Sequence, residues 1–248
     1  MTLQEFFSLN SKVAIAFSGG VDSSYLLYAA RSFGAVVRAY YVKAEFQPEF
    51  EYEDAMRLAS ELCADVRVIK LNVLSDSCVT ANPSDRCYYC KKTIFTAILE
   101  AAKADGFTVL LDGTNASDDE GDRPGMRALK ELTVMSPLRE CGLTKNQIRQ
   151  LSKEAGLFTW DKPAYACLAT RIQTGEEITA QKLKATESAE DYLFSLGFSD
   201  FRVRYQNGHA KLQMPEEQLN LLLEHREAIL TKLKEHYKTV SLDLEVRG

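Results

Sequence analysis

The sequence predicts an α/β fold: a domain built on a parallel β-sheet, followed by a smaller α+β domain. Over residues 1–165, short apolar segments alternate with longer amphipathic ones, a pattern typical of a parallel sheet covered by helices on both faces. Over residues 166–248 the pattern changes to helix, two short strands, helix and strand. A chain of 248 residues is long enough to bury one sizeable core and a smaller second one.

Each element of the first domain follows from its local pattern. Residues 13–17, VAIAF, form an apolar strand that stops at two glycines, and from Tyr25 onward apolar residues recur at helical spacing. A later helix starts after Thr144, a suitable N-cap, and ends at Gly156. The same criteria predict strands at 35–42, 64–71 and 108–112, and helices at 49–63 and 91–104.

The second domain is reached through a segment without clear periodicity. Residues 157–171 contain Pro163 and are predicted to be an ordered connector and a candidate site loop. Asn207-Gly208 between two alternating runs is a strong hairpin signal. The elements predicted here, in the order αββαβ, are a helix at 179–196, strands at 201–205 and 210–214, a helix at 215–236 and a strand at 240–246.

Charge and composition exclude several classes of protein. With 30 Lys and Arg against 35 Asp and Glu, the net charge is -5, so no overall positive field collects nucleic acid and any anion site is local. No run approaches the ~18 apolar residues of a membrane helix, and the opening residues lack a signal pattern, so we expect a cytoplasmic protein without a membrane partner. The 6 cysteines are too sparse for a disulfide scaffold, and the close pair Cys87 and Cys90 suggests metal or redox chemistry.

The turn after the first strand has the chemistry of a phosphate cradle. Glycines let the backbone approach an oxyanion, hydroxyls add donors, and the following helix contributes its positive N-terminus. The turn is neither a Walker A loop nor GxGxxG, and a plain turn with a serine N-cap is the simpler alternative. Asp22 would repel a bare polyphosphate, so the loop also predicts Mg2+ bound to Asp22. The candidate nucleotide ligands are Ser18, Gly19, Gly20, Asp22, Ser23 and Ser24.

The sequence SGGVDSS, directly after a strand, resembles the PP-loop of the ATP-pyrophosphatase superfamily, which includes NAD and GMP synthetases and several sulfur-inserting enzymes. The resemblance implies the adenine nucleotide alpha hydrolase-like fold for residues 1–165, with ATP as the cofactor. In such enzymes ATP is cleaved between its α and β phosphates, and AMP is transferred to a substrate oxygen. Adenylation turns a poor leaving group into a good one, while the loop stabilises the developing pyrophosphate charge.

Gly113 and Thr114 stand at the end of a predicted strand, where open α/β sheets bind ligands, and with Arg123 they join the candidate nucleotide-binding residues. They belong to a longer set of segments: GTN at 113–115, SDDEGDRPGMRAL at 117–129, SPL at 136–138, LTKNQIRQL at 143–151, DKPAYACLATR at 161–171 and RVR at 202–204. Taken together, these segments resemble the LarE-type pyridinium-3,5-bisthiocarboxylic acid mononucleotide synthases.

This second resemblance implies a sulfur transferase of nickel-pincer nucleotide cofactor biosynthesis. A carboxylate of a pyridinium dicarboxylate mononucleotide is adenylated, and sulfur then displaces AMP to leave a thiocarboxylate. Cys167 falls on the family's sulfur-donor position. In one branch that cysteine surrenders its own sulfur once, and in another branch three cysteines hold a [4Fe-4S] cluster that carries an extra sulfide.

This chain has the three cysteines of the cluster-bearing branch. Cys87 and Cys90 form a C-x-x-C loop, and Cys167 supplies a third thiolate, one short of the usual four for a cubane. We therefore expect an iron without a protein ligand that can bind sulfide. Taken alone, C-x-x-C is also compatible with half of a zinc site, a redox pair or coincidence.

Charged residues of the second domain complete the candidate site. Arg202 and Arg204 lie on one strand face by the period of two, which suits a grip on the substrate's phosphate, although exposed arginines on a sheet are more often only solvated. Arg171 ends the ACLATR segment and is a further candidate. Glu190 matches an acidic position of the family, although a glutamate on a helix is by default a surface residue. The chain reads AKLQ at 210–213, where the family usually shows Ala-Arg-Ile-Glu.

Three rival functions remain at this stage. A tRNA thiolation enzyme also joins a PP-loop to cysteine-bound clusters, but the acidic net charge and the lack of a basic, aromatic arm oppose it. An amide-forming synthetase has no use for three thiolates, and an iron–sulfur carrier would not release pyrophosphate. The expected partners are a small-molecule nucleotide and sulfide or a sulfur donor protein, without nucleic acid. The resemblance also implies a homo-oligomer, a hexamer in the family, with residues 166–248 serving substrate binding and oligomerisation.

Overall fold

The computed structural model describes residues 1–118 and 124–245, and the chain folds into two compact units. A single boundary at residue 165 misses the segment Leu74–Ser84, which belongs to the second unit. Asn82 holds it there, because its Nδ2 donates hydrogen bonds to the carbonyl oxygens of Gln173 (2.9 Å) and Glu176 (3.2 Å). The units comprise Met1–Val73 with Asp85–Ala164, and Leu74–Ser84 with Tyr165–Gly248.

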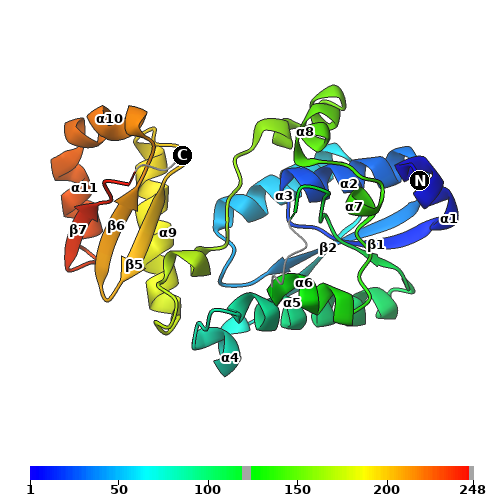
Figure 1. The fold of residues 1–248 in the computed structure, drawn as a ribbon, viewed down its shortest axis with the longest axis horizontal. Helices are drawn as coiled ribbons and strands as arrows, with labels where there is room; N and C mark the ends of the chain where they lie inside the picture. Colours follow the sequence, from blue (N-terminus) through cyan, green and yellow to red (C-terminus); the bar gives the residue numbers. More distant parts are fainter. Residues whose placement is uncertain (119–123, 246–248) are drawn as a thin grey trace. The chain divides into compact units, whose positions relative to one another are not determined.

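A parallel sheet of four strands, in the order β3-β2-β1-β4, organises the first unit and confirms the predicted fold class (Figure 1). In the register of this sheet, Ala14 of the central strand pairs with Arg38 on one side and with Leu110 on the other. The elements are α1 (Leu3–Leu9), β1 (Lys12–Ala16), α2 (Val21–Ser32), β2 (Val36–Lys43), α3 (Glu49–Glu61), β3 (Val66–Lys70), α5 (Arg86–Ala104), β4 (Leu110–Leu111), α6 (Pro124–Glu131), α7 (Pro137–Glu140), α8 (Lys145–Glu154) and η2 (Phe158–Asp161).

Helices cover both faces of this sheet. α2, α3 and α8 lie over one face, and α5 and α6 lie over the other (Figure 1). Ile15 of β1, Leu26 of α2, Leu58 of α3 and Ile148 of α8 are each fully buried in one core cluster. Each such side chain contributes about 1.5–3 kcal/mol by leaving water. This core holds the carboxyl end of β1 beside the N-terminus of α2, where the predicted phosphate loop lies.

The second unit is built on a three-stranded sheet in the order β5-β6-β7. The predicted hairpin is confirmed: β5 and β6 pair antiparallel around Asn207 and Gly208, both with positive φ, and β7 pairs parallel to β6. Its elements are η1 (Val73–Ser75) at the unit boundary, α4 (Ser77–Thr80), η3 (Leu168–Arg171), α9 (Ala180–Ser195), β5 (Arg202–Gln206), β6 (His209–Gln213), η4 (Glu216–Gln218), α10 (Leu219–Glu224), α11 (Arg226–Leu233) and β7 (Thr239–Leu242). Over residues 1–118 and 124–245, neither unit contains a helix long and apolar enough to cross a membrane.

Two expectations about local structure are wrong. α5 begins at Arg86 rather than at residue 91, so Cys87 and Cys90 lie in a helical turn and not in a loop. That turn gives little hydrophobic signal, because the residues it buries are Arg86 and Cys90. The helix expected at 215–236 is divided at His225, which ends α10 and starts α11. The sequence-based description also omits α1, which a capping box at Thr2 begins.

Candidate active site

The loop after β1 folds into a tight turn that opens α2, as the sequence predicts. Gly20 is the N-cap of α2, and no side chain among residues 1–118 and 124–245 caps the helix, so the N–H groups of its first turn stay available for an anion. The Ser23 hydroxyl closes the turn: it accepts from the Ser18 N–H (3.2 Å), donates to the Gly20 carbonyl (3.2 Å) and lies 3.0 Å from Ser18 Oγ. Ser24 Oγ is buried without a hydrogen-bond partner among the described residues.

Two glycines allow neighbouring elements to approach this loop closely. Gly19 has a φ of 75°, and a Cβ built on it would lie 2.7 Å from the Cβ of Ala55 on α3. A Cβ on Gly113, just after β4, would lie 2.9 Å from the backbone nitrogen of Ser23. The structure therefore places Gly19, Gly113 and the start of α2 together, at the carboxyl edge of the sheet where open α/β proteins bind ligands.

Asp22 is the charged residue of the loop, and Lys145 is its partner. Lys145 Nζ lies 2.6 Å from Asp22 Oδ2, and Asn115 Nδ2 donates to Asp22 Oδ1 at 3.4 Å. Burial raises the pKa of the Asp22 carboxyl, and the hydrogen bond and charge of Lys145 act in the opposite direction. A partly exposed carboxylate in the first turn of α2 has the hard oxygen ligands that Mg2+ prefers.

The segment after β4 supports the loop through a second carboxylate. Asp112, 5% exposed, accepts hydrogen bonds from Ser136 Oγ (2.6 Å) and from Thr114 Oγ1 (2.5 Å). Thr114, a predicted ligand, thus uses its hydroxyl to fix the end of the strand. Arg123, another predicted nucleotide ligand, lies outside the described residues.

The cysteine pair lies at the start of a 19-residue helix. Cys87 is exposed and Cys90 is buried, and their spacing of three residues puts both on one face of α5. Arg86 Nη2 donates to Cys87 Sγ at 3.8 Å. The pair can hold a metal, but the described residues contain no group of three or more His, Cys, Asp or Glu side chains arranged to bind one.

Cys167 belongs to the second unit, where it caps η3. Its carbonyl oxygen accepts hydrogen bonds from the Thr170 N–H (2.9 Å) and Thr170 Oγ1 (2.8 Å). The guanidinium of Arg171 interacts electrostatically with the Cys167 side chain. The backbone of Cys167 is therefore fixed, and its side chain lies near the buried guanidinium of Arg171.

Arg171 and Glu190 form a buried ion pair rather than an open ligand site. Arg171 Nε lies 2.8 Å from Glu190 Oε1 and Nη2 lies 3.0 Å from Oε2, and their side chains are 0% and 1% exposed. Arg171 Nη1 also donates to the carbonyl of Ala166 (2.8 Å). Glu190 accepts further hydrogen bonds from the Tyr165 hydroxyl and, at 2.9 Å, from the Val203 N–H. These contacts make the two residues supports for the segment that carries Cys167.

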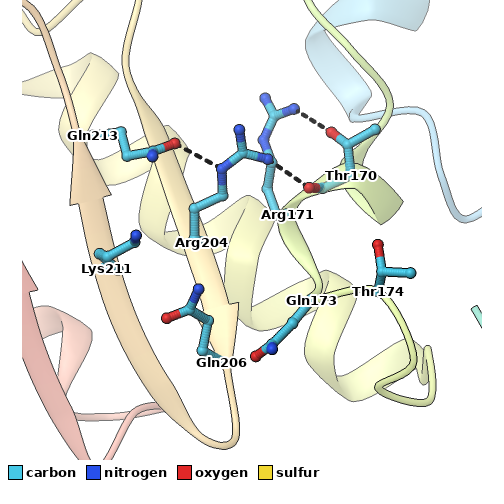
Figure 2. Close-up of a pocket in the computed structure, with 8 residues that line it drawn as sticks. All are labelled: Thr170, Arg171, Gln173, Thr174, Arg204, Gln206, Lys211 and Gln213. Carbon is cyan, nitrogen blue, oxygen red and sulfur yellow. Dashed lines mark hydrogen bonds between the residues drawn. The ribbon is translucent and has the colours of Figure 1, made fainter. Parts of the chain in front are cut away.

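A polar pocket of about 250 Å3 opens between η3 and the sheet of the second unit (Figure 2). Arg204 crosses it, donating through Nε to Gln213 Oε1 (2.7 Å) and through Nη1 to the Thr170 carbonyl (2.6 Å). Arg202 does not line this pocket: it is 5% exposed and stacks 5.2 Å from the ring centre of Tyr165. The lining residues are Thr170, Arg171, Gln173, Thr174, Arg204, Gln206, Lys211 and Gln213.

Comparison with known proteins identifies the family. No family model matches the chain. An uncharacterized protein of Synechocystis is 36% identical, over 98% of this chain and 92% of that protein. The pyridinium-3,5-bisthiocarboxylic acid mononucleotide synthase of Lactiplantibacillus plantarum is 34% identical, over 94% of this chain and 86% of its own length. The chain belongs to this synthase family.

Membership of the synthase family confirms the predicted resemblance and makes the chain an ATP-dependent sulfurtransferase. Its core domain is shared more widely. A tRNA-specific 2-thiouridylase of Clostridium botulinum is 30% identical, but the match covers 60% of this chain and 52% of the thiouridylase.

Sequence reasoning missed two residues that the fold brings to the loop, Lys145 and Asn115. Both lie within segments that match the synthase family, and Asn115 follows directly on two residues that were selected. Nothing in the sequence pairs Lys145 with Asp22, 123 positions earlier. Only the packing of α8 against α2 shows that they meet.

Proposed function

We propose that the chain adenylates a carboxylate of a pyridinium dicarboxylate mononucleotide and replaces AMP with sulfur in nickel-pincer nucleotide cofactor biosynthesis. The observation that carries this proposal is the 34% identity, over 94% of the chain, to the synthase of L. plantarum. The loop between β1 and α2 supports the ATP half of the reaction, and the three cysteines support the sulfur half.

The proposed adenylation uses the positive end of α2. The N–H groups of its first turn, with the hydroxyls of Ser18, Ser23 and Ser24, would bind the β and γ phosphates. Asp22 would hold Mg2+, which neutralises phosphate charge. The substrate carboxylate oxygen then attacks the α-phosphorus, the bond to the bridging oxygen breaks, and pyrophosphate leaves with its charge stabilised by the loop.

The proposed substrate site uses Arg204. Its guanidinium crosses a polar pocket that also contains Lys211, so the pocket can accept a phosphate group. Arg202 would contribute to substrate binding from its position beside Tyr165. Arg171 and Glu190 would keep the Cys167 segment in position. Sulfide then attacks the carbonyl carbon of the acyl adenylate, AMP departs, and a thiocarboxylate remains.

We propose that Cys87, Cys90 and Cys167 hold a [4Fe-4S] cluster. Two thiols on one helical turn, beside an arginine and a helix N-terminus, fit an iron site, and thiolates are the ligands that such clusters require. When bound, the cluster would carry the sulfide that is transferred. Cys87 and Cys90 belong to the first unit, and Cys167 belongs to the second. Sulfide or a sulfur donor protein would resupply the sulfur, and we expect a homo-oligomer, a hexamer if the family's assembly forms.

The proposal is tested by anaerobic purification of the wild type and Cys87→Ala, with iron and sulfide analysis. The two proteins are then incubated with ATP, Mg2+, sulfide and the pyridinium dicarboxylate mononucleotide, and pyrophosphate and thiocarboxylate are counted per protein. We expect four irons and several turnovers for the wild type, and loss of both in Cys87→Ala, with pyrophosphate release retained.

Other results would assign other functions. At most one sulfur transferred per metal-free protein would place the chain in the branch that sacrifices Cys167. Pyrophosphate release that depends on bulk tRNA, and not on the pyridinium nucleotide, would favour a tRNA thiolation enzyme, to which the thiouridylase match points. No pyrophosphate release with either substrate would refute the proposal.

A further inference from the structure

Lys145 brings a positive charge to a phosphate loop that has none of its own. The loop reads SGGVDSS from Ser18 to Ser24, and it contains neither Lys nor Arg. Lys145 reaches it from α8, with Nζ 2.6 Å from Asp22 Oδ2. The side chains of Lys145 and Asp22 are 32% and 22% exposed, so a ligand arriving from solvent can reach both.

The backbone of Lys145 is fixed, while its side chain can move. Thr144 caps α8 through a capping box with Gln147, and the Lys145 N–H donates to Ser117 Oγ at 3.0 Å. Long side chains in a helix point toward its N-terminus, which here directs the ammonium group over the loop. A lysine is a compact charge on a flexible stem, so its ammonium group can shift by several ångströms without moving the helix.

Lys145 remains the partner of Asp22 only as long as no metal ion binds the Asp22 carboxylate. Three charges act on Asp22 from neighbouring segments: Asp118 as a second negative charge, and Lys145 and Arg149 of α8 as positive charges. Mg2+ bound to the Asp22 carboxylate would neutralise it and release Lys145. The released ammonium group of Lys145 could then bind the phosphates of the incoming nucleotide.

We propose that Lys145 exchanges partners when nucleotide binds: it neutralises Asp22 in the nucleotide-free protein and moves to the nucleotide phosphates when Mg2+ takes over Asp22. This inference rests on the proposed use of ATP and Mg2+ by the loop. It makes Lys145 a nucleotide-binding residue that also competes with the metal. Removal of its charge should therefore weaken nucleotide binding and strengthen metal binding. Loss of a merely structural residue would not change these two affinities in opposite directions.

The test uses the full-length protein and the variants Lys145→Met and Lys145→Arg. Binding of α,β-methylene ATP with Mg2+ is measured by calorimetry, and binding of Mn2+ to the nucleotide-free protein by electron paramagnetic resonance. Without the lysine charge, we expect the nucleotide to bind about 10- to 100-fold more weakly, as for the loss of a charge-assisted hydrogen bond. We expect Mn2+ to bind about 3- to 10-fold more tightly, because its competitor for Asp22 is gone.

Lys145→Arg should keep most of the nucleotide affinity. The matched control is Lys103→Met, which removes an exposed lysine in the last turn of α5 and should leave both affinities unchanged. Circular dichroism and thermal unfolding verify that each variant is folded. Nucleotide affinity of Lys145→Met within twofold of the wild type, or weaker binding of both ligands, would overturn the partner exchange. A wild-type protein that binds no nucleotide would instead refute the proposed function.

Discussion

Arg171 and Glu190 determine how the segment around Cys167 is held. A buried charge is costly unless it is paired and hydrogen-bonded, and here the guanidinium contacts both carboxylate oxygens and the Ala166 carbonyl. The carboxylate in turn accepts the N–H of Val203 on β5. The pair thus connects α9, β5 and η3, and its contribution to activity would be indirect, through the position of Cys167.

Removing one member of this pair should be strongly destabilising. In Glu190→Ala the guanidinium of Arg171 would remain buried without its counter-charge, at an expected cost of about 3–5 kcal/mol in the free energy of unfolding. Urea denaturation at pH 7 measures this cost. The double variant Arg171→Met/Glu190→Leu should recover part of it, because no buried charge remains. The control Lys232→Ala, in the exposed pair with Glu235, should cost less than about 1 kcal/mol, and equal costs would contradict the argument.

At the scale of elements, α5 runs from the cysteine pair at its N-terminus to Asp105 at its C-terminus, which contacts strands β2 and β3. The helix starts one residue before Cys87 and ends at Ala104, and its 19 residues span about 28 Å. Its C-cap, Asp105, accepts hydrogen bonds from Arg67 of β3 and Tyr40 of β2, both at 2.9 Å, and pairs with Arg38 at 3.1 Å. One carboxylate therefore anchors α5 to two strands, and the anchored helix fixes the Cys87 end.

The Asp105 anchor should weaken in acid. The hydrogen bond from Arg67, followed by those from Tyr40 and Arg38, lowers the pKa of Asp105 to about 2, against burial, which raises it. Because this pKa lies below the value of about 3.9 for an unfolded chain, the contribution to stability is complete above that value and is lost as the pH falls toward 2. The urea midpoint of Asp105→Asn should therefore lie below that of the wild type at pH 7, and the difference between the two midpoints should narrow between about pH 4 and pH 2. A gap that does not change with pH would contradict this assignment.

At the scale of the whole molecule, the chain crosses between the two units more than once. Residues 74–84 leave the first unit, join the second and return before α5 begins. Asn82 attaches this segment: it is 3% exposed, its side chain donates to the carbonyls of Ile172, Gln173 and Glu176, and its own carbonyl accepts from the Gly175 N–H at 2.8 Å. The second unit is therefore not a contiguous C-terminal fragment, and a chain that starts at residue 165 lacks part of it.

Replacing Asn82 by Gly tests this attachment. Asn82 has a φ of 51°, which glycine adopts without strain, so the substitution removes the side-chain hydrogen bonds without straining the backbone. We expect the second unit to lose about 1–3 kcal/mol and the amides of Gly175 and Ile178 to exchange hydrogen faster. Asn207→Gly, at an exposed turn with the same φ of 51°, should leave both measurements almost unchanged. Unchanged exchange in Asn82→Gly would show that another contact holds the segment.

Local patterns were sufficient for most elements of this fold but not for the start of α5. The Thr144 cap, the Asn207-Gly208 hairpin and the glycine turn after β1 each depend on residues adjacent in sequence, and the structure contains all three. The first turn of α5 escaped prediction because it buries an arginine and a cysteine, which carry little hydrophobic periodicity. At the site, residue type suggested Asp22 and Glu190 as candidates, yet it did not reveal that the first pairs with Lys145 and the second with Arg171.

The sequence by itself determined the order of the strands, the glycine turn between β1 and α2 and the family, because these depend on local spacing and on matching segments along the chain. Only the tertiary structure decided which charges meet. Ion pairs join residues 19 and 123 positions apart, and segment 74–84 packs with residues from 165 onward. Such pairings are set by burial, since a charge removed from water requires a partner that the fold alone can bring within reach.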